Sequence, residues 1–102
     1  MDAHRLVGSV VQLMENDDTA GLKALHDSGK WTDLEMVVDS VKDADGNTWH
    51  YSALTWAAGQ SQIGVMRLLI QLGAKTNEER EWHIPPSTAA ASTGSIEGLK
   101  LL

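Results

Sequence analysis

Cysteine and phenylalanine are both absent from this sequence of 102 residues, which holds one tyrosine, four tryptophans and two prolines. Without cysteine, the chain has no disulfides, no thiolate zinc site and no cysteine nucleophile. Because large aromatic side chains are few, we expect Leu, Val, Ile, Met and Ala to build the core. The lack of cysteine fits a cytoplasmic location, with the nucleus as the alternative.

Basic residues are also scarce, since eight Lys and Arg stand against fourteen Asp and Glu, which gives a formal net charge of −6. This balance argues against binding to nucleic acid or to an anionic membrane, because both are themselves negatively charged. No apolar run approaches the roughly 18 residues of a membrane span. The length allows one domain or a short array of small repeats.

Internal repetition is the most informative property of the sequence. Trp49-His50 recurs 33 positions later as Trp82-His83. The same offset relates Thr55 to Thr88, Ala57-Ala58 to Ala90-Ala91, Ile63 to Ile96, and Leu68-Leu69 to Leu101-Leu102. A weaker upstream copy lies at an offset of 44, which aligns Gly29 with Gly73 and makes the connection after the first copy the longer one. Matches spread over a whole segment at one offset indicate a duplicated structural unit.

Each unit is predicted to be two helices joined by a tight turn. In the middle copy, Ser52 can cap a helix from Ala53 to about Gln60. Apolar residues at three- and four-residue spacing then predict a second helix from about Ile63 to Leu72. Gly73 follows as a left-handed C-terminal cap.

The outer copies follow the same plan. Apolar spacing predicts helices near residues 6–14 and over residues 19–27 in the first copy. In the third, Pro85-Pro86 opens a helix, and Gly94 separates it from another that starts near Ser95. We expect this last helix to be cut at Leu102, where the sequence stops on apolar residues. The predicted units are an N-terminal capping repeat (1–29), a long inserted finger (30–51), a second repeat (52–84) and a truncated third repeat (85–102).

The period and the local sequence together resemble the ankyrin repeat family. Residues 52–58 (Ser-Ala-Leu-Thr-Trp-Ala-Ala) match its T-P-L-H-x-A-A segment, and residues 73–77 (Gly-Ala-Lys-Thr-Asn) match its G-A-D-x-N segment. Ser61-Gln62 stands where the family has Gly-His. The resemblance implies an all-α solenoid of stacked helix pairs with β-hairpin-like connecting fingers, one of them lengthened. It also implies a non-enzymatic scaffold that binds another protein on a concave surface.

The segment from Trp31 to Val41 permits two interpretations. Thr32 and Glu35 fit a capping box, and the apolar spacing also suits a short helix. Alternation of apolar residues and the turn-rich stretch 42–47 instead favour a hairpin, because β-prone residues follow directly. We favour the elongated hairpin, since an extended connection is expected at this point of the repeat.

Motifs for chemistry are weak throughout. Asp43-Ala44-Asp45-Gly46-Asn47 begins like a calcium loop, but its glycine is misplaced and Leu54 stands where a glutamate is required, so we predict a turn. His50 and His83 occupy equivalent positions on neighbouring units, yet a metal site needs three or four ligands. No catalytic triad and no phosphate loop is recognisable. We therefore expect no enzyme, no metal and no cofactor.

Tryptophan and tyrosine are frequent anchors of protein interfaces, and the repeat register places Trp49 and Trp82 on successive fingers. Covering the ends of the core is the alternative role for these rings, most of all for Trp56. Acidic residues near the finger tips would favour a basic ligand, unless they form only a solvated rim. The predicted partner-binding residues are Trp49, Tyr51, Trp56, Gln60, Trp82, Ile84, Asp43, Asp45, Glu79 and Glu81.

A protein-protein interaction scaffold is the function that the sequence favours, with a partner that carries a basic segment. The alternative is an N-terminal regulatory or targeting module of a larger enzyme or channel, suggested by the abrupt Leu101-Leu102 ending. We also expect self-association through the uncovered C-terminal helix.

Overall fold

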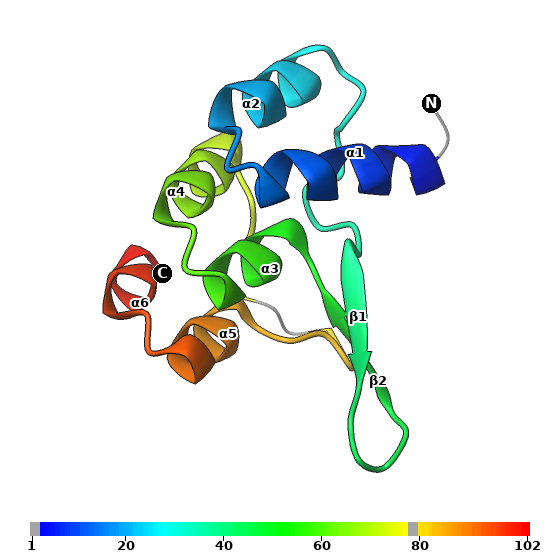
Figure 1. Ribbon diagram of the computed structural model, residues 1–102, viewed down its shortest axis with the longest axis vertical. Helices are drawn as coiled ribbons and strands as arrows, with labels where there is room; N and C mark the ends of the chain where they lie inside the picture. Colours follow the sequence, from blue (N-terminus) through cyan, green and yellow to red (C-terminus); the bar gives the residue numbers. More distant parts are fainter. Residues whose placement is uncertain (1–2, 78–79) are drawn as a thin grey trace.

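The computed structural model describes residues 3–77 and 80–102, which form a mostly helical structure with one small antiparallel sheet (Figure 1). The helices are α1 (Ala3–Glu15), α2 (Thr19–Asp27), α3 (Ala53–Gly59), α4 (Ile63–Leu72), α5 (Pro86–Thr93) and α6 (Ile96–Leu101). The strands are β1 (Asp39–Lys42) and β2 (Thr48–Tyr51). Among the described residues, none of these helices has the length and apolarity needed to cross a bilayer.

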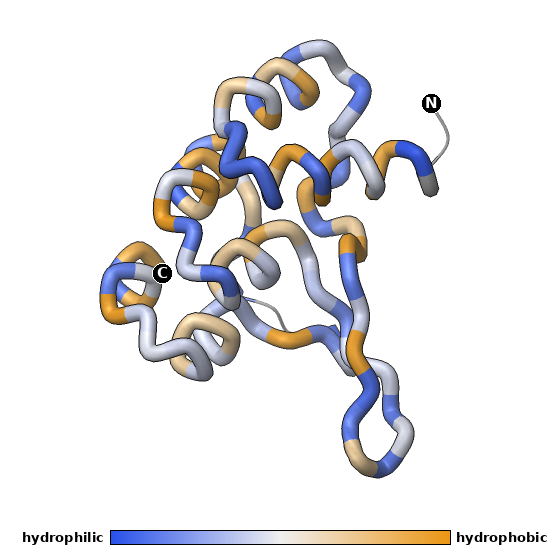
Figure 2. Tube along the Cα trace, viewed as in Figure 1, coloured by the Kyte–Doolittle hydropathy of each residue, from blue (hydrophilic) through white to orange (hydrophobic). Residues whose placement is uncertain are grey.

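The helices form two layers. One layer contains α1, α3 and α5, with α3 packed against both neighbours, and the other contains α2, α4 and α6, with α4 in the middle (Figure 1). Small residues permit the close approach of α3 and α5, because Ala57 and Ala58 on one helix and Ala89 and Ala90 on the other are all buried. The hairpin of β1 and β2 projects beyond the helices as a largely hydrophilic extension interrupted by an apolar band (Figure 2).

The turn inside each helix pair has the same backbone conformation three times. Its first feature is a residue with positive φ at Asp17 (53°), Ser61 (56°) and Gly94 (70°). Its second feature is a hydrogen bond from the next amide, which joins Asp18 to the carbonyl of Leu13 (2.9 Å), Gln62 to Ala57 (3.0 Å) and Ser95 to Ala90 (2.9 Å). These positions are separated by 44 and 33 residues, as the sequence offsets predict. The three turns therefore share one local geometry at the offsets found in the sequence.

The predicted helix boundaries are confirmed, and local chemistry explains them. The Ser52 hydroxyl oxygen accepts a hydrogen bond from the Thr55 amide (3.3 Å) at the start of α3. Gly73 adopts φ of 106° at the end of α4, a conformation that costs glycine little. Pro86 occupies the first turn of α5, where its missing amide hydrogen leaves no helical bond unmade.

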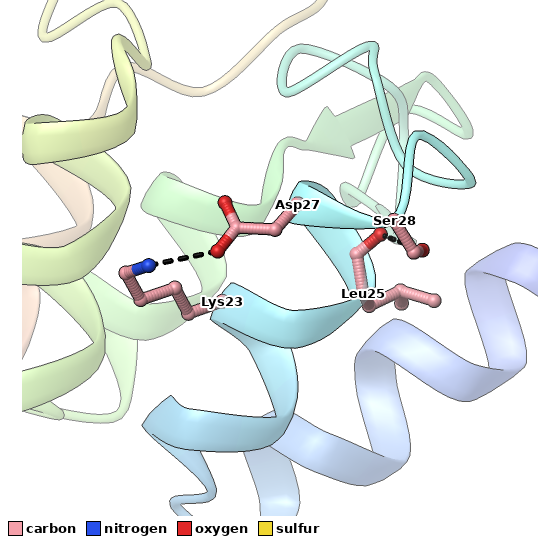
Figure 3. A network of polar contacts seen from close by, with 4 residues as sticks. All are labelled: Lys23, Leu25, Asp27 and Ser28. Atoms are coloured by element: carbon pink, nitrogen blue, oxygen red, sulfur yellow. Dashed lines mark hydrogen bonds and ion pairs between the residues drawn. The ribbon is translucent and has the colours of Figure 1, made fainter.

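The end of α2 is stabilised by side-chain bonds on its exposed side (Figure 3). Lys23 Nζ donates to Asp27 Oδ2 at 2.7 Å, and this hydrogen bond lowers the pKa of Asp27. Ser28 Oγ donates to the Leu25 carbonyl at 2.7 Å. The ion pair is exposed, so its contribution to stability is small.

Trp31 is the largest fully buried side chain, so the core that was expected to consist of Leu, Val, Ile, Met and Ala also contains an aromatic ring. Its indole nitrogen donates to the Asp33 carbonyl at 3.2 Å, and its own carbonyl accepts a bond from His26 Nδ1 at 2.8 Å. Leu34 and Val38, which come later in the same segment, are also buried in the core. The chain between α2 and the hairpin is thus fixed by one large ring rather than by a helix.

The hairpin that was expected from residue 31 onward forms only over residues 39–51, and residues 31–38 form neither the alternative helix nor a strand but a loop with a turn. The expected capping box does not form, because the Asp33 carboxylate accepts a hydrogen bond from the Glu35 amide (3.0 Å) and holds a turn. The Glu35 carboxylate instead accepts from the Lys75 amide at 3.1 Å. Strand pairing then runs from Asp39 opposite Tyr51 to Lys42 opposite Thr48.

Candidate functional site

The hairpin of the first finger (residues 30–51) is extended sideways by the second finger (residues 74–84, described except for 78 and 79). His50 and His83 form a parallel bridge. The His50 amide donates to the Trp82 carbonyl at 2.8 Å, and the Ile84 amide donates to the His50 carbonyl at 3.0 Å. Backbone hydrogen bonds at His50 therefore join the two fingers into one surface.

One side of this surface carries a row of apolar side chains, here called the finger face: Val41, Trp49 and Trp82. Val41 lies directly opposite Trp49 across the ladder. The Trp49 and Trp82 rings meet edge to face, with centroids 5.1 Å apart and planes at 71°. Val41 and Trp82 remain 41% and 39% exposed, so the row is open to solvent.

Two further predicted residues lie nearby. Tyr51 lies two positions after Trp49 in β2 and is on the same side of the hairpin by alternation, whereas Ile84 follows the bridge residue His83 outside the named strands. Tyr51 is half-buried, and Ile84 packs against the core. The Ile84 carbonyl accepts a hydrogen bond from Thr55 Oγ1 at 2.8 Å, which fixes the second finger to α3.

Trp82 also has an unusual backbone conformation. Its φ is 64°, in the left-handed region that bulky residues seldom adopt. Such conformations are retained where surrounding contacts impose them. At Trp82 these contacts are the bond from the His50 amide to its carbonyl and the ring contact with Trp49.

The tip of the first finger is organised by the carboxylate of Asp43. Oδ1 accepts hydrogen bonds from the amides of Asp45 (2.9 Å) and Asn47 (3.0 Å), and Oδ2 accepts from Trp49 Nε1 (2.9 Å) and Asn47 Nδ2 (3.4 Å). The bond from Trp49, aided by those from Asn47 and Asp45, lowers the pKa of Asp43. Gly46 supplies a φ of 84° in the same turn. The turn predicted for residues 43–47 is confirmed, and the Asp43 carboxylate stabilises it by accepting these hydrogen bonds.

Two other carboxylates predicted near the site lie in turns. Asp45 is in the turn at the tip of the first finger, and Glu81 is in the turn directly before Trp82; both are exposed. Asp39 Oδ1 accepts a hydrogen bond from the Ser40 amide at 2.8 Å. Glu79 lies outside the described residues. The carboxylates near the apolar row thus come from β1, from the hairpin turn and from the turn before Trp82.

Trp56 and Gln60 lie on and beside α3 rather than on the fingers. Trp56 is half-buried and packs against the apolar core, and Gln60 is exposed at the C-terminal end of the helix. Among the described residues, the ring contact joins Trp49 to Trp82 and does not include Trp56. Sequence reasoning missed Val41, although the alternating pattern of the strand contained the signal.

The opposite side of the hairpin holds a polar pair. Ser40 Oγ and His50 Nδ1 are 2.8 Å apart, and the His50 and His83 rings are tilted by 49° with centroids 5.2 Å apart. A serine beside a histidine is one part of a nucleophilic site, which also needs a group that orients the histidine and donors for an oxyanion. Within the described part of the chain, no group of three His, Cys, Asp or Glu residues is arranged to hold a metal ion.

Comparisons with known proteins returned no match: no protein-family model, no curated protein and no solved structure is similar enough to this chain to be reported.

Proposed function

We propose that this chain is a protein-interaction module of the ankyrin type, which binds another protein through its fingers and carries no catalytic site or cofactor of its own. The repeated turn geometry supports this proposal, because helix pairs that recur at a fixed offset are the building plan of solenoid proteins. The bridge between successive fingers supports it as well, since it turns two connections into one continuous surface.

The finger face carries the proposal. Val41, Trp49 and Trp82 form an uninterrupted apolar row across two fingers, and two of the three are more than one-third exposed. Tryptophan offers a large contact area at a low entropy cost, which is why it is common among interface residues that dominate affinity. Because these apolar side chains lie outside the core, we attribute their position to contact with a partner rather than to packing within the chain.

Charge indicates the kind of partner. The exposed carboxylates of Asp39, Asp45 and Glu81 lie on β1, in the hairpin turn and directly before Trp82, and the whole chain has a net charge of −6. A partner segment with Lys or Arg beside an apolar side chain would complement both features. We place the interaction in the cytoplasm, or in the nucleus, on the strength of the cysteine-free composition.

Affinity capture tests this function. The chain would be compared with the Trp82→Asn variant, because asparagine accepts the left-handed backbone conformation while removing the ring. Ile96→Ser, an apolar-to-polar change on α6, is the matched control. We expect specific partners to be lost from Trp82→Asn, retained by Ile96→Ser, and released by raised salt. Equal capture by all three proteins would contradict binding at the finger face.

A further inference from the structure

The turn at the tip of the first finger contains the one Asp-Gly step of the sequence, Asp45-Gly46. Asp45 is exposed, and the turn lies at the end of the hairpin, away from the helices (Figure 1). An amide nitrogen that follows an aspartate can attack the side-chain carboxyl carbon, and glycine hinders this attack least because it has no side chain. The position that a Cβ of Gly46 would occupy is open, since no atom beyond its chain neighbours lies within 4 Å.

The two aspartates of this turn are held differently. Asp43 accepts hydrogen bonds on both carboxylate oxygens, among them that from Trp49 Nε1 at 2.9 Å. Within the described part of the chain, no donor holds the Asp45 carboxylate, whose residue is fixed through its amide alone. The Gly46 amide is held by a single bond to the Asp43 carbonyl at 3.1 Å. Loop tips open locally at low free energy, so the Asp45 side chain can turn towards the nitrogen that follows it.

We infer that Asp45 is a site of spontaneous isoaspartate formation, and that this modification releases Trp49 from Asp43. In the first step the Gly46 nitrogen bonds to the carboxyl carbon of Asp45 and loses its proton, while one carboxyl oxygen leaves as water. The product is a succinimide ring. Water then adds to the main-chain carbonyl carbon of Asp45 and breaks its bond to nitrogen, which leaves a free α-carboxylate and a chain that runs through the side-chain carbons. Water is the only co-reactant.

The hydrogen bonds of the turn explain the effect on Trp49. Isoaspartate lengthens the main chain by one carbon between the amides of Asp45 and Asn47. Both amides donate to Asp43 Oδ1, at 2.9 and 3.0 Å, and the longer chain cannot keep both in this geometry. Asp43 then loses the position in which its other oxygen accepts from Trp49 Nε1. The inference goes beyond the proposed function, because it concerns a covalent change that needs no partner.

The test is prolonged incubation of the folded protein at neutral pH. The protein is then digested with an endoproteinase that cuts before aspartate and offered to an isoaspartyl carboxyl methyltransferase with labelled S-adenosylmethionine. We expect a labelled peptide that contains residue 45 and is no longer cut there. Asp45→Glu is the matched control, because its longer side chain keeps the charge but cyclises far more slowly, and it should lose the label.

Three results would overturn the inference. The first is label at Asp39 instead, whose carboxylate accepts the hydrogen of the following Ser40 amide at 2.8 Å. The second is label that forms only when the chain is unfolded in urea, because the turn would then protect Asp45. The third concerns the purified isomerised protein, in which the Trp49 Nε1–H resonance should move to its position in Asp43→Ala. An unchanged resonance would show that the modification does not release Trp49.

Discussion

The finger face and the C-terminal helix α6 both expose large apolar side chains, but they hold them in different ways. Trp49 and Trp82 are positioned by a ring contact, a bond to Asp43 and the bridge between the fingers. Ile96 and Leu99, 68% and 42% exposed, lie on the short outermost helix. Directional bonds fix the first group in one geometry, as recognition requires. Ile96 and Leu99 instead resemble the apolar side chains that pack one helix pair against the next.

Removing the ring at the base of the first finger should give the largest effect. Trp31→Ala deletes the largest fully buried side chain, and we expect the free energy of unfolding to fall by about 3–5 kcal/mol. Urea denaturation followed by circular dichroism measures this change. Trp82→Asn, which removes an exposed ring of the same type, should cost far less. Equal losses would show that the finger is not anchored through the core.

The packing of the C-terminal helix pair, α5 and α6, offers a test of the other region, because Ala90 on α5 lies beside Gly98 on α6. Ala90→Leu places a larger side chain where α5 is buried, and we expect a loss of about 1–3 kcal/mol from overpacking. Ala91→Leu, at the exposed neighbouring position, is the matched control and should change stability by about 0.5 kcal/mol or less. Both values come from denaturant titrations. A small effect at Ala90 would mean that the C-terminal pair is loosely packed.

A double change on α6 sharpens the distinction between recognition and packing. Ile96→Ser with Leu99→Ser removes exposed apolar area, so we expect any concentration-dependent self-association to disappear while stability changes by about 0.5 kcal/mol or less. Sedimentation velocity over a range of concentrations measures this. Trp82→Asn should not alter the association. If it abolishes association instead, the finger face is the self-contact.

Acid should loosen the finger tip before the rest of the fold. The folded-state pKa of Asp43 lies below its ordinary value of 3.8, mainly because Trp49 donates to it. Its contribution to stability is therefore fully present above about pH 4 and is lost as the pH falls through the lower folded value. The Trp49 Nε1–H resonance should shift in this range and exchange faster. Asp43→Ala should produce the same state at neutral pH, and Asp45→Ala should not.

The helix boundaries could be predicted because their signals are local. The Ser52 cap, the Gly73 stop and the Pro86 start each act within one turn of the chain, so neighbouring residues contain the information. The 33-residue offset also predicted that Trp49 and Trp82 lie on successive fingers, and the structure places their rings in contact.

The parts that could not be predicted depend on distant contacts. Burial of Trp31 follows from the packing of several elements, and the apolar pattern of its own segment permits a short helix as well as the favoured hairpin. The bond from Trp49 to Asp43 depends on the geometry of the turn between them, which spacing alone does not determine. The ankyrin resemblance remains a prediction that supports the proposed function.

The outer strand of the hairpin has a consequence for behaviour at high concentration. The backbone groups of His50 face the second finger, so those of its partner Ser40 point outward from the free edge of the sheet. The carboxylate of Asp39 already accepts the Ser40 amide hydrogen. A strand from another molecule would meet negative charge where it needs a donor, which discourages sheet growth and fibre formation. The protein can thus display tryptophan at its surface without offering a template for aggregation.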